Sequence, residues 1–270
     1  MNRVPLARRA QIISCLVEGN SIRSTERMTG THRDTICRLL VEVGEGRAQL
    51  MREQMRELPC RRIQVHEIWA YLGKEQTHLT RQDDRSRLGD MWTLVALELG
   101  PTYRVGKRTG ANAVAFMTDL SSRLANRVQL SSDALSTYVD AVERAFGADV
   151  DYGQEVKFYE AEPIGAGRYS PPKVVDRSRV VIAGDPDQAH ISTSLVERQN
   201  LTMRMSMRRF MRLTNAFSKK AQNLAAAVSL HFAHYNFVRV HRSLRVTPAM
   251  EARVSDRLWS PDELVERTSA

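Results

Sequence analysis

One carboxylate in the sequence has surroundings that suggest phosphate or metal chemistry. Glu197 is the only acidic residue in the segment 191–250, which contains ten Lys and Arg residues. The lack of Gly and Pro predicts a long helix over residues 193–220, with polar and cationic side chains along one face: Glu197, Asn200, Arg204, Arg208 and Arg212. A carboxylate at the head of such a row can bind a metal ion beside phosphates. The alternative is a surface ion pair with Arg198 or Arg204, worth less than about 1 kcal/mol.

A second carboxylate, Asp133, lies where an α/β sheet presents catalytic groups. It follows a β-prone run that ends at residue 130 and precedes a helical pattern over residues 134–146. Active groups in such sheets tend to lie at strand ends, near the point where the strand order reverses. An Asp at this position can equally be the N-cap of the helix, and position alone leaves both interpretations open.

The distribution of charge indicates a polyanionic partner. The chain has 270 residues, with 40 Lys and Arg against 31 Asp and Glu, and the net excess of nine equals the excess within residues 191–250 alone. Such concentrated positive charge favours nucleic acid as a partner. The apolar fraction of 42% is enough for one large domain or two modest ones.

Composition excludes several other classes of protein. No apolar run approaches the roughly 20 residues that span a bilayer, and the N-terminus lacks a secretory signal, so we expect a cytoplasmic protein without a membrane partner. The three Cys residues are widely spaced without a CxxC pair, which argues against a disulfide framework or a zinc site. His231 and His234 lack the Glu of an HExxH motif and are interpreted as packing residues.

Residues 1–45 have the pattern of a helix-turn-helix DNA-binding domain. Apolar residues at helical spacing predict three short helices, with Ser21 capping the second and Gly30 turning the chain before the third. The third helix presents Arg33 and Arg38 on its polar face, as a recognition helix does in a major groove. A small helical bundle with solvated charges explains the same pattern, and charge does not decide between them.

Residues 46–61 are predicted to form a helical linker into an α/β domain. Three β-prone runs, a helix, a fourth strand and a second helix follow in that order, at residues 63–72, 92–97, 103–105, 111–124, 127–130 and 134–146. The Gly and Pro content of residues 160–190 predicts a long irregular connection with one strand at 180–183. A last helix is predicted over residues 223–240.

Motifs along nearly the whole chain resemble the DDE transposases of the insertion-sequence-one family. They lie at residues 64–69 (Gln-Val-His-Glu-Ile-Trp), 89–92, 103–108, 132–133, 196–201, 234–237 and 247–250. The string over residues 197–210 is the most specific part of the resemblance. The family implies an RNase H-like catalytic domain over residues 62–250, with a mixed sheet flanked by helices. An all-α helix-turn-helix domain precedes it, and residues 251–270 form a C-terminal tail.

The resemblance also implies a reaction and its cofactor. Such enzymes cut and join DNA at two Mg²⁺ (or Mn²⁺) ions roughly 4 Å apart, held by three carboxylates. The second and third carboxylates map to Asp133 and Glu197, which are thereby the expected catalytic metal ligands. The implied partners are double-stranded DNA of the element's terminal repeats and of the target, bound by a homodimer at the nucleoid of a bacterial cytoplasm. The cationic residues expected to bind DNA are Arg33, Arg38, Arg204, Arg208, Arg209 and Arg212.

The first carboxylate of the family motif is replaced in this chain by His66. Glu67 is no simple substitute, because adjacent strand residues point to opposite faces of a sheet. An imidazole can bind a softer ion such as Mn²⁺ or Zn²⁺ through one nitrogen, but it cannot bridge two Mg²⁺ ions. Asp90 on the next strand is a less favoured substitute. The connection at residues 98–102 is also shorter than the family's usual hairpin.

Two functional hypotheses follow from the resemblance. The first is a DDE transposase that binds element ends and carries out metal-dependent strand cleavage and transfer, with its catalysis impaired by His66. The second is a non-catalytic, sequence-specific DNA-binding protein, either a relic or a regulator of transposition.

Overall fold

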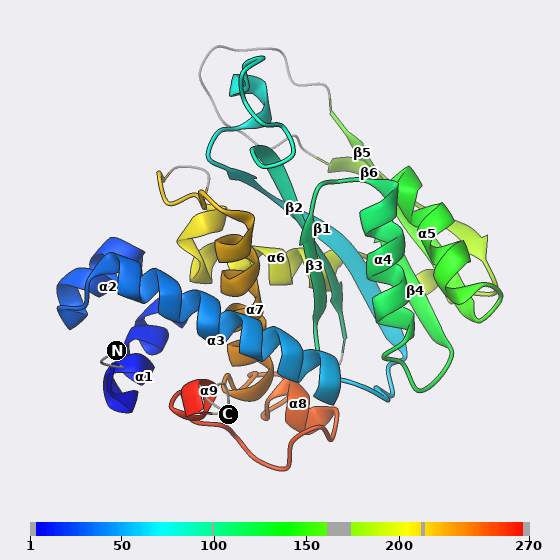
Figure 1. Ribbon diagram of the computed structural model, residues 1–270. Coiled ribbons are helices and arrows are strands. Elements are labelled where there is room, and N and C mark those ends of the chain that lie inside the picture. Colours follow the sequence, from blue (N-terminus) through cyan, green and yellow to red (C-terminus); the bar gives the residue numbers. More distant parts are fainter. Residues whose placement is uncertain (1–3, 99, 161–173, 212–213, 267–270) are drawn as a thin grey trace.

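The structure is a computed structural model that describes residues 4–98, 100–160, 174–211 and 214–266. Its centre is a six-stranded mixed sheet flanked by helices, and helices from both ends of the chain pack beside it (Figure 1). In sheet order the strands are β3 (Thr102–Gly106), β2 (Gly89–Leu97), β1 (Arg62–Leu72), β4 (Val128–Asp133), β5 (Val150–Tyr159) and β6 (Val174–Ala183). The predicted α/β class, with a mixed sheet flanked by helices, is confirmed.

The pairing of the central strands brings two predicted site residues together. β1 runs antiparallel to β2 but parallel to β4, and β4 runs parallel to β5. The edge strands β3 and β6 pair antiparallel with β2 and β5. Val65 of β1 is the partner of Ser132 of β4, so the residues that follow them, His66 and Asp133, are neighbours across the two strands.

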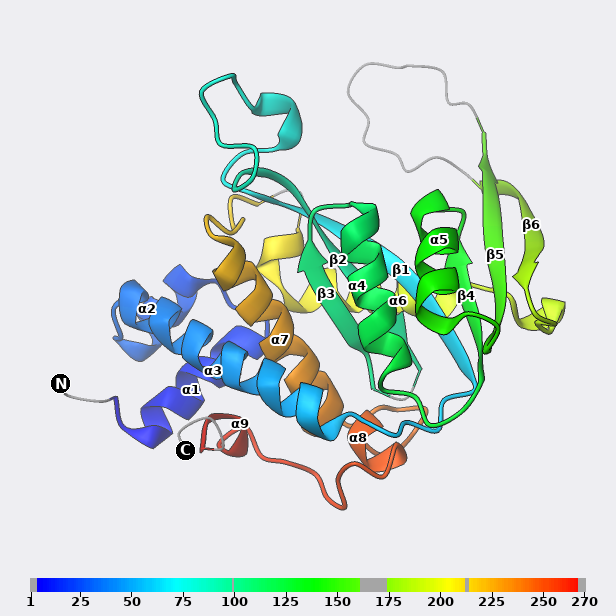
Figure 2. The same cartoon turned by 45° about the vertical axis from the view of Figure 1, so that its right-hand side comes forward.

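The two faces of the sheet carry different helices. Helices α4 (Gly110–Ser121) and α5 (Ser136–Phe146) cover one face, and α6 (Ser194–Ser206) lies on the other, against β1 and β2 (Figure 2). The apolar side of α4 and α5 is fully withdrawn from solvent, since Phe116, Met117 and Tyr138 are each 0% exposed. Burial of such side chains supplies much of the free energy that holds a helix on a sheet.

The N-terminal region forms three helices at the predicted places: α1 (Leu6–Val17), α2 (Ile22–Thr29) and α3 (Arg33–Gln54). The Ser21 hydroxyl caps α2 by accepting the backbone N–H of Ser24 at 3.0 Å. Gly30 ends α2 with a left-handed φ of 65°, which glycine adopts without steric cost. α3 continues through residue 54 into the segment predicted as a linker. The helix-turn-helix assignment itself stays a prediction.

A close helix contact joins the N-terminal helices to the sheet. α3 packs on α7 (Ala221–Phe237) at Gly44, where an added Cβ would come within 2.5 Å of the Ala226 carbonyl oxygen. The Ser229 hydroxyl of α7 donates to the Gly44 carbonyl at 2.6 Å. α7 in turn stacks Phe232 on Tyr103 of β3, with ring centroids 4.9 Å apart. The glycine therefore sets how closely these two helices approach.

The predicted helix over residues 193–220 is wrong beyond Ser206. α6 ends there, Met207 has extended backbone angles (φ −134°, ψ 108°), and a short 3₁₀ turn, η3 (Arg208–Phe210), follows. The side chains of Met207 and Phe210 are buried, at 6% and 2% exposure. Packing of these two residues overrides the helical propensity of the segment.

Two strands occupy much of the chain that follows α5. The sequence patterns do not predict β5, and they predict only residues 180–183 of β6. The expected irregular connection over residues 160–190 is therefore wrong at β6, and its residues 161–173 lie outside the described part of the chain. β6 is an edge strand with few buried residues, so it lacks the alternation that identifies a half-buried strand.

The remaining elements are short. The 3₁₀ turns η1 (Gln76–His78) and η2 (Gln188–His190) lie in connections, and α8 (Pro248–Glu251) and α9 (Glu263–Glu266) follow α7. α9 packs on α1 and α3, where Leu264 and Val265 are fully buried. No helix within the described ranges combines the length and the apolar composition needed to cross a membrane.

Replacing Gly44 with Ala is expected to destabilise the protein by about 1–3 kcal/mol, because the new methyl group would collide with the α7 backbone. The greater helix propensity of Ala acts in the opposite direction, so the sign of the change identifies the close contact. Urea denaturation measures the effect. Gly110→Ala is the control, since an added Cβ there meets nothing within 4 Å. Equal stability of the two variants would contradict the close packing.

His231, on α7, is expected to make the protein less stable in acid. Burial lowers the pKa of this imidazole to about 3 from an ordinary 6.5, so the unfolded chain binds the proton more tightly than the folded one. Stability should then fall by about 2 kcal/mol as the pH drops from 6.5 to 4.5. Urea midpoints across this range should show that loss for the wild type and a smaller loss for His231→Gln. His78→Gln, which alters an exposed histidine, should keep the full slope.

Candidate functional site

The N-terminus of α6 is fixed to the sheet by buried polar side chains. The Gln64 side-chain carbonyl on β1 accepts the backbone N–H groups of Leu195 and Val196 at 2.7 and 3.2 Å. The Glu155 carboxylate on β5 accepts the backbone N–H and the hydroxyl of Thr193 at 3.1 and 2.7 Å. These bonds satisfy donors that a helix start leaves without partners. They hold the first turn of α6, which carries Glu197, over β1 and β5.

His66 lies between the sheet and α6. Its Nε2 is 3.6 Å from Oε1 of Glu197, and its Nδ1 accepts the backbone N–H of Glu67 at 2.7 Å. Because Nδ1 is an acceptor, the neutral ring carries its proton on Nε2 and directs it toward Glu197. The imidazole is therefore hydrogen-bonded through Nδ1, while Nε2 faces Glu197 at a distance longer than a hydrogen bond.

Glu67 points away from α6, as strand alternation predicts. Its carboxylate accepts the Tyr138 hydroxyl at 3.1 Å and forms a hydrogen-bonded ion pair with Arg108. Burial raises the pKa of Glu67, and the nearby Asp133 carboxylate raises it further. Both oxygens of Glu67 are thus occupied by neighbours on the α4 and α5 side of the sheet.

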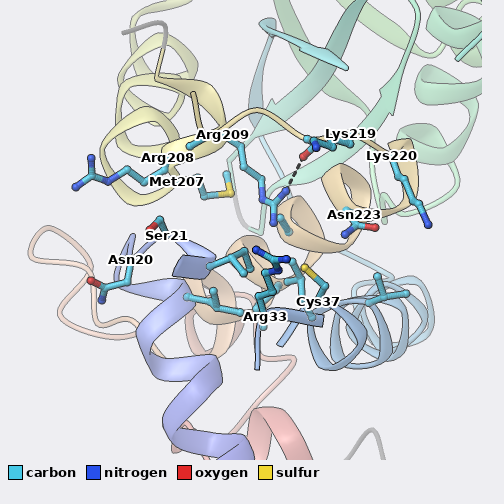
Figure 3. Close-up of a pocket in the computed structure, with 18 of the residues that line it drawn as sticks. Asn20, Ser21, Arg33, Cys37, Met207, Arg208, Arg209, Lys219, Lys220 and Asn223 are labelled. Atoms are coloured by element: carbon cyan, nitrogen blue, oxygen red, sulfur yellow. Dashed lines mark hydrogen bonds between the residues drawn. The ribbon is translucent and has the colours of Figure 1, made fainter. Parts of the chain in front are cut away.

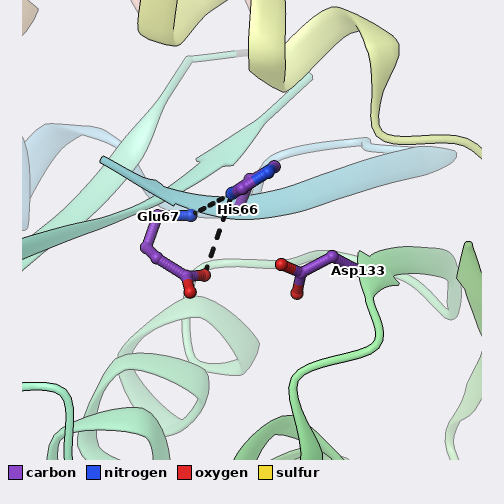
Figure 4. Close-up of side chains that lie close together, drawn as sticks. All are labelled: His66, Glu67 and Asp133. Atoms are coloured by element: carbon purple, nitrogen blue, oxygen red, sulfur yellow. Dashed lines mark hydrogen bonds and ion pairs between the residues drawn. The ribbon is translucent and has the colours of Figure 1, made fainter. Parts of the chain in front are cut away.

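Asp133 ends β4 and is not the N-cap of the next helix. Leu135 has that position in α5, and Asp133 Oδ1 accepts the Leu135 backbone N–H at 3.3 Å. Ligand atoms of His66, Glu67 and Asp133 all lie within 4.8 Å of one another (Figure 4). The predicted neighbours His66 and Asp133 are therefore brought together. Glu197 is absent from this group, although it contacts His66.

A lysine that the sequence patterns miss holds Glu197. The Lys157 ammonium on β5 forms a hydrogen-bonded ion pair with Glu197 Oε1, and it donates to the Thr193 hydroxyl at 3.0 Å. Thr193 Oγ1 also lies 2.6 Å from Glu197 Oε1, so the two carboxylates of Glu155 and Glu197 share its single hydroxyl proton. Partial burial opposes ionisation of Glu197, but the hydrogen bonds from Lys157 and Thr193 outweigh it and lower the pKa.

Glu155 completes this network behind Glu197. Its carboxylate lies 3.5 Å from Lys157 and 3.2 Å from Arg177 of β6. Burial raises its pKa, yet the bonds from Thr193 and the two cations lower it overall. Glu155 and Lys157 are two positions apart on one strand, so a charged i, i+2 pair on β5 is the sequence signal that marks them.

The donor set differs from the three carboxylates that hold two Mg²⁺ ions. Position 66 supplies an imidazole, Glu67 is bound by Arg108 and Tyr138, and Glu197 is bound by Lys157. An imidazole with one carboxylate suits a single ion that accepts mixed nitrogen and oxygen ligands, such as Mn²⁺, better than a pair of Mg²⁺ ions. The residues present therefore do not fit two Mg²⁺ ions. Asp90 accepts the Gln76 backbone N–H at 3.2 Å and does not belong to the cluster.

The predicted DNA-binding residues divide into two groups. Those from α3 and η3 line one cleft of about 1860 Å³ beside α6, and they are Arg33, Arg38, Arg208 and Arg209. Arg204, on α6, is half-buried and is not among the lining residues. Arg212 lies outside the described residues. The single straight row expected on one helix face is therefore wrong, because η3 is not part of α6.

Comparisons with known proteins do not add to this geometry. No protein-family model and no curated protein matches the chain. The site is therefore interpreted from its own residues.

Lys157→Gln is expected to strengthen Mn²⁺ binding at this centre about tenfold, because it removes a positive charge that competes for Glu197. Titration followed by electron paramagnetic resonance of free Mn²⁺ measures the affinity. Lys74→Gln is the matched control, since Lys74 pairs with Asp83 at a separate place. Equal Mn²⁺ affinities of the wild type and both variants would contradict the role given to Lys157.

Proposed function

We propose that the chain is a DDE-type transposase of the insertion-sequence-one family whose Mg²⁺-dependent strand cleavage is impaired at His66. The observation that carries this proposal is the placement of the three positions of the family motif. His66 and Asp133 lie within 4.8 Å of each other, and His66 lies 3.6 Å from Glu197. Residues 66, 133 and 197 are remote in sequence, and only the folded arrangement of β1, β4 and α6 unites them.

The strand order supports an RNase H-like domain. Three antiparallel strands, β1 to β3, are followed by β4 and β5 parallel to β1, and α6 returns across β1. In the family that the sequence resembles, the catalytic residues lie on the first strand, at the end of the fourth strand and on the long helix. Positions 66, 133 and 197 have these locations here.

The surface near the site supports DNA as the partner. The cationic residues of α3 and η3 face a common cleft next to α6. We infer that the chain binds double-stranded DNA of element ends and targets, with α1 to α3 as a helix-turn-helix unit and a homodimer holding two ends. Such a protein acts at the bacterial nucleoid.

A second candidate is a regulator that binds DNA without cutting it. The pairing of Lys157 with Glu197 favours this function, because the third carboxylate is already neutralised within the protein. His66 adds a hydrogen-bond donor where a catalytic centre of this kind needs negative charge. The regulator would occupy element ends and exclude an active relative.

His66→Asp is expected to raise Mg²⁺-dependent nicking of supercoiled plasmid DNA by at least about 100-fold over the wild type, the size typical of one catalytic electrostatic group. Gel electrophoresis separates nicked from intact plasmid. Adding Glu197→Gln to His66→Asp should abolish the gain and exclude a contaminating nuclease. If His66→Asp stays inert while it still binds DNA, position 66 is not the defect and the second candidate is favoured. Full Mg²⁺-dependent nicking by the wild type would contradict the impairment.

A further inference from the structure

A large cleft lies between the N-terminal helices and the segment that follows α6. Its volume is about 1860 Å³, well above the roughly 300–1,000 Å³ of a pocket for one small molecule. One wall is formed by the start of α2 and α3, the opposite wall by residues 207–209 and 214–220, and α7 lies behind both (Figure 3). A cleft of this size and shape fits part of a polymer.

The cleft collects cations from separate parts of the chain. Its basic lining residues are Arg23, Arg33, Arg38, Arg208, Arg209, Lys219 and Lys220. None of these seven forms an ion pair with a carboxylate in the described part of the chain. The three acidic lining residues have neighbours of their own, since Glu42 pairs with Arg9, Glu45 accepts a hydrogen bond from Gln222, and Asp34 lies 3.6 Å from His32. The cleft therefore has a net positive charge that its own residues do not neutralise.

The two walls face each other across a short distance. Burial raises the pKa of the Cys37 thiol of α3, and Arg209 and Lys220 of the opposite wall lie near enough to oppose that rise. Arg209 is held in place by a 2.6 Å bond to the Ser218 hydroxyl, while Lys219 and Lys220 are exposed. Like charges in this arrangement repel one another until an anion enters, which favours binding of a polyanion.

We propose that this cleft binds the phosphodiester backbone of DNA, with Arg33 and Arg38 on phosphates rather than on base edges. The inference rests on the proposed function, DNA binding, and specifies where on the protein the DNA binds. A recognition helix reads bases with its polar face open to a groove about 12 Å wide. The polar start of α3 instead borders a cleft whose other wall is formed by residues 207–209 and 214–220. Phosphate contacts suit cations on both walls.

The cleft also has a direct relation to the candidate catalytic centre. α6 carries Glu197 in its first turn and ends at Ser206, where the basic wall begins. Nine residues of helix at about 1.5 Å each correspond to roughly 14 Å, a span of a few nucleotides. A strand bound in the cleft can therefore continue along α6 to Glu197.

Fluorescence anisotropy with labelled 20-nucleotide probes tests the proposal. Each of two unrelated sequences is tested both as a single strand and as a duplex. The form that binds more tightly identifies whether the cleft takes single-stranded or double-stranded DNA. Arg33→Ala and Lys220→Ala should each weaken binding about fivefold or more, equally for both sequences. Each should also reduce the slope of log affinity against log salt by about one. Arg81→Ala, which removes an exposed arginine outside the cleft, should change neither quantity.

The outcomes separate this inference from the proposed function. Wild-type binding that survives both cleft variants overturns the cleft and leaves DNA binding intact. If Arg33→Ala weakens binding to one probe sequence more than to the other, Arg33 reads bases, and the assignment of Arg33 to phosphates is overturned. Absence of any wild-type binding overturns the proposed function itself.

A chemical readout in the same cleft is independent of affinity. Cys37 is half-buried in the lining, so maleimide labelling of Cys37 in a Cys15→Ser background should slow several-fold when DNA is bound. Labelling of Cys37 that is unchanged at saturating DNA would place the DNA elsewhere.

Discussion

The attachment of the α6 N-terminus to the sheet determines most of what surrounds the site. Gln64 and Glu155 supply the acceptors that the first turn of this helix needs, and both are buried polar groups whose loss would leave donors without partners. The same bonds set the position of Glu197 above β1 and the direction in which α6 leaves the sheet. Because α6 is short, they also determine where the basic segment after Ser206 begins.

Charge balance at the centre is achieved by the protein alone. Three of the carboxylates at the site have a cation beside them: Glu67 has Arg108, Glu197 has Lys157, and Glu155 has Arg177. Buried charges are tolerated only when they are paired and hydrogen-bonded, so these contacts keep the site folded without an added ion. These ion pairs leave fewer carboxylate oxygens to bind a metal ion, since a carboxylate held by an ammonium group is less available to a metal.

The sequence predicts which residues form this site better than it predicts the contacts that those residues make. Asp133 and Glu197 could be singled out from strand-end position and local charge, and the sheet brings His66 beside Asp133 as expected. The sequence does not single out Lys157, because β5 mixes Gly153 and charged residues with apolar ones. The partners of its buried charges lie on β6 and at the start of α6, which are remote in sequence. The sequence likewise gives no signal for the end of α6. Neither Gly nor Pro marks it, and the burial of Met207 and Phe210 is a tertiary effect.

The identity of residue 66 has a genetic consequence under the proposed function. Asp and His codons differ by a single base, and the imidazole at this position fits the fold with Nδ1 hydrogen-bonded and Nε2 facing Glu197. Under the proposed function His66 is a substitution, and β1 still pairs with β2 and β4 around it. Under the proposed function, one point mutation separates a silent copy from an active one. A population of such genes can therefore lose and regain activity without passing through an unfolded protein.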